Sequence, residues 1–110
     1  MVKPISSARE PEALMLERGL RRAALGLLAD LEVYFRETVG KSFVQYLMDD
    51  PVRAYRLATS RYPESLVRAA LRAALRLGLG ASSADVELAV EMLSTGIPSK
   101  FLALLNRAAQ

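Results

Sequence analysis

Apolar residues recur with helical spacing along most of this 110-residue chain. The longest such segment begins near Glu10, and Pro11 suits its first turn because that position needs no amide hydrogen. The segment ends at Gly40, a residue type that favours the left-handed conformation found just after helices. Placed at about 100° per residue, one stripe of the segment collects Leu16, Leu20, Ala23, Ala24, Leu27, Leu31, Tyr34, Phe35 and Thr38. This pattern predicts one long amphipathic helix.

Two features inside this segment bear on how it packs. Gly19 and Gly26 each weaken a helix by about 1 kcal/mol relative to alanine, so either a close approach of another helix or a kink would explain them. Several apolar side chains also project away from the main stripe; they are Leu14, Met15, Leu25 and Val33. These four residues indicate that the helix is covered on more than one side, and we expect them to form a self-association surface, with a homodimer favoured.

Capping residues divide the rest of the chain into shorter helices. We predict helices over 42–49, 51–61, 63–77, 82–93 and 98–108, each opened by a serine, by aspartate before proline, or by proline. Gly78 is expected to end the fourth helix of the chain. No segment alternates apolar and polar residues as a strand would. The predicted fold is therefore all-α, a compact bundle of five or six helices with one long N-terminal helix; residues 10–110 form a single domain after a flexible tail over 1–9.

Composition restricts the function classes. The chain contains no cysteine and no histidine, so it lacks disulfides, sulfur-based zinc sites and the usual general base near neutral pH. It also lacks a phosphate-binding loop and a dinucleotide fingerprint. We therefore expect a protein that is not an enzyme and has no cofactor, no metal and no small-molecule substrate. No apolar run approaches the ~20 residues of a membrane span and no export signal is evident, so we expect a cytoplasmic protein without a membrane partner.

The apolar content is high for a small domain. Apolar residues make up 52 % of the chain before its six glycines are counted, against roughly 45–50 % when glycine is included. Either a self-association interface or an alanine-rich core would accommodate this excess. Arginine outnumbers lysine twelve to three and amide side chains are few, which is typical of proteins from thermophiles, although a genome rich in arginine codons has the same effect.

Positive charge is concentrated between residues 51 and 80. This part of the chain holds one acid, Glu64, and six arginines: Arg53, Arg56, Arg61, Arg68, Arg72 and Arg76. The last three lie four residues apart, a spacing at which like charges disfavour a helix by a few tenths of a kcal/mol per pair. One interpretation is a face that binds nucleic-acid phosphates. The alternative is a face neutralised by acids from other helices; these are Asp49, Asp50, Glu87 and Glu91.

Three weaker signals each have a structural alternative. The helix pair near the C-terminus resembles a helix-turn-helix whose reading positions are Ser99, Lys100, Asn106 and Arg107, or it is an ordinary helical hairpin. The acid pair Asp49-Asp50 suits magnesium, or it caps the helix that starts at Pro51. Tyr55, Arg56, Arg61 and Tyr62 could form an aromatic–arginine group that stacks on exposed bases. The alternative is that these rings belong to the core.

Taken together, the sequence predicts a non-catalytic helical interaction or assembly module that self-associates. The alternative is a nucleic-acid-binding protein that uses the arginine-rich face of the helices over 51–61 and 63–77. The two hypotheses involve different residues, because the first depends on apolar side chains of the long helix and the second on arginines.

Overall fold

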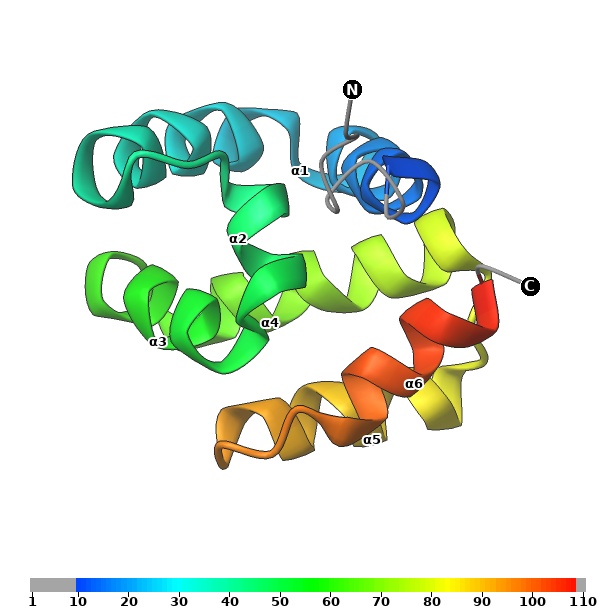
Figure 1. Ribbon diagram of the computed structural model, residues 1–110. Helices are drawn as coiled ribbons and strands as arrows, with labels where there is room; N and C mark the ends of the chain where they lie inside the picture. Colours follow the sequence, from blue (N-terminus) through cyan, green and yellow to red (C-terminus); the bar gives the residue numbers. More distant parts are fainter. Residues whose placement is uncertain (1–9, 109–110) are drawn as a thin grey trace, which may run out of the picture.

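The computed structural model describes residues 10–108, which form six α-helices and one π-helical segment (Figure 1). The elements are α1 (Glu10–Val39), α2 (Phe43–Asp49), α3 (Pro51–Arg61), α4 (Glu64–Ala73), the π-helical segment η2 (Ala74–Gly78), α5 (Ser83–Ser94) and α6 (Ser99–Ala108). The described residues contain no strand, so the predicted all-α class and long N-terminal helix are confirmed. The predicted tail over 1–9 lies outside the described residues.

The predicted helix starts are confirmed by their caps. The side chains of Ser42, Asp50 and Ser82 each accept a hydrogen bond from the backbone amide three residues later, at 3.0, 3.3 and 3.2 Å. Such bonds satisfy amides that a helix leaves without an internal partner. Because α2, α3 and α5 begin directly after these residues, the connections between helices are as short as the sequence indicates.

The long helix α1 is bent at Ala24, whose backbone leaves the helical region (φ −154°, ψ 61°). Figure 1 shows its two halves running in different directions. Most of the predicted stripe nevertheless faces the core on both sides of the bend, with Leu16, Leu20, Leu31 and Phe35 buried. Two of its members, Ala23 and Thr38, are exposed, and Leu28, which the stripe omits, is buried. After the bend, α1 therefore buries Leu28 in addition to the predicted Leu31 and Phe35.

Gly19 lies where α1 crosses η2. A Cβ atom added to Gly19 would stand 2.8 Å from the amide nitrogen of Gly78 and 2.9 Å from the carbonyl oxygen of Ala74, while one added to Gly78 would stand 2.1 Å from the carbonyl oxygen of Met15. The two backbones therefore touch without room for a side chain. Close approach, one of the two explanations for Gly19, is confirmed at this position.

The sequence suggested that Gly78 ends the fourth helix of the chain, but the structure shows that it does not. Helical turns continue through it, and the end comes at Gly80, which has a positive φ of 72°. The amide of Gly80 donates to the carbonyl of Arg76 (3.1 Å) and that of Ala81 to the carbonyl of Leu75 (3.2 Å), the pattern of a helix C-terminus. Gly78 serves the crossing with α1 instead.

The core is built around aromatic rings and leucines from all parts of the chain. Phe35 of α1 is fully buried and meets Phe43 of α2 edge-on, with ring centroids 5.0 Å apart. Phe101 of α6 is also fully buried. Within residues 10–108, no helix combines the length and the apolar content needed to cross a membrane.

Candidate functional site

The arginine face is partly neutralised by α5. Arg68 Nη2 lies 2.6 Å from Glu91 Oε1, and Arg72 Nε lies 2.8 Å from Glu87 Oε2. The hydrogen bond to Glu91 raises the pKa of Arg68 above its ordinary value. Two of the acids that the sequence offered as neutralising partners, Glu87 and Glu91, thus pair with arginines in the middle of the predicted row. These ion pairs connect α4 to α5.

The other four arginines remain exposed. Within residues 10–108, no carboxylate lies within 4.0 Å of the guanidinium groups of Arg53, Arg56, Arg61 and Arg76. Only these members of the predicted nucleic-acid face are left to meet an external anion. Three of them belong to α3, so the open positive charge is centred on that helix rather than on α4.

The predicted stacking group is divided by the fold. Arg61 lies over two rings, with its guanidinium carbon 5.1 Å from the ring centroid of Tyr34 and 5.6 Å from that of Tyr62. The Tyr62 hydroxyl donates to Asp30 of α1, and burial together with this bond raises the Tyr62 pKa. Arg61 and Tyr62 are therefore held at the surface as a cation–π pair.

Tyr55, the remaining ring of that group, belongs to the core. Its side chain is almost completely buried, and its hydroxyl donates to Glu64 Oε2 at 2.5 Å. Burial, followed by this hydrogen bond, raises the pKa of Tyr55 to about 12. The core alternative is confirmed for this ring.

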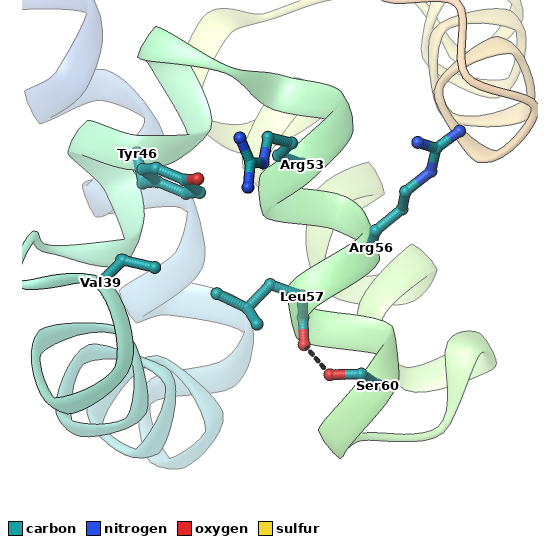
Figure 2. Close-up of a pocket in the computed structure, with 6 residues that line it drawn as sticks. All are labelled: Val39, Tyr46, Arg53, Arg56, Leu57 and Ser60. Carbon is teal, nitrogen blue, oxygen red and sulfur yellow. Dashed lines mark hydrogen bonds between the residues drawn. The ribbon is translucent and has the colours of Figure 1, made fainter.

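A cavity of about 360 Å³, here called the α1–α3 cavity, lies between the end of α1, α2 and α3 (Figure 2). Its lining residues are Val39, Tyr46, Arg53, Arg56, Leu57 and Ser60. Figure 2 shows the Val39 and Leu57 side chains facing one another and the Tyr46 hydroxyl turned toward the Arg53 guanidinium. The Arg56 guanidinium extends away from Tyr46, and its Nη2 lies 3.1 Å from the place that a Cβ of Gly96 would occupy.

Sequence reasoning missed this cavity as a site. It named Arg53 and Arg56 as candidates, but the apolar and aromatic wall comes from three helices whose mutual packing the sequence does not give. The sequence feature that could have indicated the site is Tyr46 in the short helix α2, which directly precedes the arginine-rich helix α3.

The position of Tyr46 is fixed by its neighbours. Its ring packs against Phe35 with centroids 5.8 Å apart, and Lys41 Nζ lies 6.0 Å from its centroid. Lys41 is in turn held by Asp49 Oδ2 at 3.2 Å. Asp49 is thus an ion-pair partner and Asp50 a helix cap, so the capping explanation is confirmed for Asp50 alone.

The self-association candidates fall into two groups separated by the bend in α1. Before it, Leu14 is 53 % exposed and Met15 is half-buried; after it, Leu25 and Val33 are 59 % and 55 % exposed. Two exposed small residues, Gly26 and Ala29, accompany the second group at positions that share one side of a helix. We call Leu25, Gly26, Ala29 and Val33 the α1 outer face.

The helix pair at the C-terminus is joined by ion pairs. Asp85 of α5 receives Lys100 Nζ and Arg107 Nη1 of α6, both at 3.1 Å. The hydrogen bonds from Lys100 and Arg107 lower the pKa of Asp85 below its ordinary value. Two of the four proposed reading residues are therefore engaged within the chain, which favours the ordinary helical hairpin.

Comparison with known proteins assigns the chain to no family. The described side chains are therefore the basis on which a function is inferred. No family model matches the sequence, and neither a curated protein nor a solved structure resembles it significantly.

Proposed function

We propose that this protein is a non-catalytic helical assembly module that pairs with a second copy of itself through the α1 outer face. The observation that carries the proposal is Gly26. Among residues 10–108, a Cβ added there would meet nothing within 4 Å, although a glycine inside a helix costs about 1 kcal/mol relative to alanine. In the same part of the chain, Gly19 has a neighbour that requires a glycine and Gly26 has none. Gly26 lies two residues after the bend at Ala24, the other explanation that the sequence allowed, and a second helix packed on this face would explain why a glycine is also exposed here.

The side chains around Gly26 suit such a contact. Leu25, Ala29 and Val33 are spaced four residues apart, so they form one row along the second half of α1. Small residues in this row let two helices approach closely, and the larger Leu25 and Val33 supply apolar area at both ends. A row that packs on its own copy generates a closed two-fold dimer.

The first group of candidates has a smaller part in this proposal. Leu14 is exposed, but Met15 already lies against Gly78 at the crossing of α1 and η2. Because α1 changes direction at Ala24, a partner helix packed along the second half of α1 would not also lie along the first half. The proposed interface therefore centres on Ala29, with Leu14 outside it.

Nucleic-acid binding is the second candidate function. The observation that favours it is the exposed cation–π pair of Arg61 with Tyr34 and Tyr62, close in sequence to Arg53 and Arg56, which form no ion pair within residues 10–108. Such a surface combines phosphate attraction with rings for stacking. It is weakened by the ion pairs of Arg68 and Arg72, which remove the middle of the predicted row.

The solution mass, measured by light scattering over a range of concentrations, tests both candidates. We expect the mass to rise toward twice 12.1 kDa as concentration increases, and a generic oligonucleotide to leave this behaviour unchanged. A mass that stays at the monomer value to the highest concentration would contradict self-association. A monomer whose mass shifts with the oligonucleotide, and less so as salt is added, would support the second candidate instead.

A further inference from the structure

We infer that the α1–α3 cavity is a binding site for one nucleotide unit, with the phosphate on Arg53 and the base against Tyr46. This inference is independent of self-association, because the cavity shares no residue with the α1 outer face. It names a ligand class that joins a planar aromatic ring to an anion. The shape, the charge and the chemistry of the lining each point to that class.

The charge of the lining selects an anion. Of the described residues, two arginines line the cavity and no acid does. Arg53 is exposed, with no carboxylate within 4.0 Å among residues 10–108, and Figure 2 shows its guanidinium on the Tyr46 side of α3. A guanidinium binds phosphate through paired N–H donors, so a phosphate at the edge of the cavity would give Arg53 the partner it lacks.

The remaining walls select a flat apolar group next to that anion. The Tyr46 ring is held by Phe35, which gives a pre-oriented aromatic surface, and stacking on such a ring accepts any base. Val39 and Leu57 add apolar contacts. Ser60 donates its hydroxyl hydrogen to the carbonyl of Leu57 (2.6 Å), and its oxygen lies 3.5 Å from the Tyr34 hydroxyl. A hydroxyl oxygen accepts two hydrogen bonds, so beside Tyr34 it can accept one more from a sugar hydroxyl or a base amine.

The size of the cavity suits a single nucleotide unit. Its volume of about 360 Å³ lies at the lower end of the roughly 300–1,000 Å³ of small-molecule sites. A dinucleotide cofactor would extend beyond it. Two sources share the required chemistry: a free nucleoside monophosphate and the 5′-phosphorylated end of a single strand.

Isothermal titration calorimetry at low salt tests the inference with adenosine 5′-monophosphate and its two halves, adenosine and ribose 5-phosphate. We expect the monophosphate to bind at least about tenfold more tightly than either half, since only it reaches both Arg53 and Tyr46. A 5′-phosphorylated oligoadenylate separates the sources: tighter binding of the oligonucleotide identifies a strand end, and equal or weaker binding identifies the free nucleotide. Absence of saturable binding by both probes would overturn the inference.

Variants locate the site. We expect Arg53→Ala and Tyr46→Leu each to weaken binding of the monophosphate about tenfold or more, whereas Tyr46→Phe, which keeps the ring, binds like the parent. Arg22→Ala removes the same charge from an exposed position of α1 and serves as the matched control. Equal weakening by Arg53→Ala and Arg22→Ala would overturn the inference, because binding would then follow net charge and not the cavity.

Discussion

Gly78→Ala is expected to lower the free energy of unfolding by about 3 kcal/mol or more. The added methyl group would stand 2.1 Å from the Met15 carbonyl oxygen, a backbone atom that no side-chain rotation can move away. The backbones of α1 and η2 must therefore separate, and the close contact of Gly19 with the backbone of Ala74 and Gly78 is lost as well. Urea denaturation followed by circular dichroism, at a concentration at which the chain is monomeric, measures the loss.

Gly26→Ala is the matched control for this substitution. It adds the same methyl group to another helical glycine, but there the group would meet nothing within 4 Å in the described part of the chain. In the monomer we therefore expect an increase in stability of about 0.5–1 kcal/mol. If Gly78→Ala changed the free energy of unfolding by less than about 1 kcal/mol, the two backbones could move apart at little cost. That result would contradict a tightly packed crossing.

Leu25→Glu combined with Val33→Glu is expected to abolish the dimer, with association weakened more than about 100-fold. Both side chains are more than half exposed, so the monomer keeps its fold. In the dimer, each glutamate would be desolvated against the same face of the second copy and would be repelled by the glutamates of that copy. Sedimentation equilibrium of the double variant beside the parent measures the change, and circular dichroism confirms the fold.

The control for this pair is Leu66→Glu combined with Leu88→Glu. These leucines are 43 % and 49 % exposed on α4 and α5, so the control adds the same charge at positions that are not part of the α1 outer face. It should dimerise like the parent. Equal dissociation of both double variants would mean that added negative charge, and not the α1 outer face, controls the mass.

Much of the fold was accessible from the sequence because its signals are local. Ser42, Asp50 and Ser82 cap helices with their own side chains and the next turn, and this needs no information about distant parts of the chain. The bend in α1 was accessible only in part. A kink was one of the two explanations for Gly26, which lies two residues beyond the bend, but the break itself occurs at Ala24, and alanine is the best helix former.

The candidate sites were less accessible because they depend on which helices become neighbours. Glu87 and Glu91 could be named as possible partners of the arginines, but their pairing with Arg72 and Arg68 follows from α5 lying beside α4. Gly19 was conspicuous by itself, whereas its counterpart Gly78 was read as a helix end. The α1–α3 cavity exists only once three helices are in place, so its lining could not be assembled from spacing.

Cross-linking through one introduced cysteine tests the central claim most directly, since the chain has no cysteine of its own. Ala29→Cys places a thiol in the middle of the α1 outer face, and packed helix axes lie about 8–10 Å apart, within reach of a short bis-maleimide. We expect covalent dimer to form efficiently from Ala29→Cys and hardly at all from Ala103→Cys, an exposed position on α6. Equal yields from the two variants, or no dimer from Ala29→Cys at a concentration where the parent is dimeric, would contradict pairing through this face.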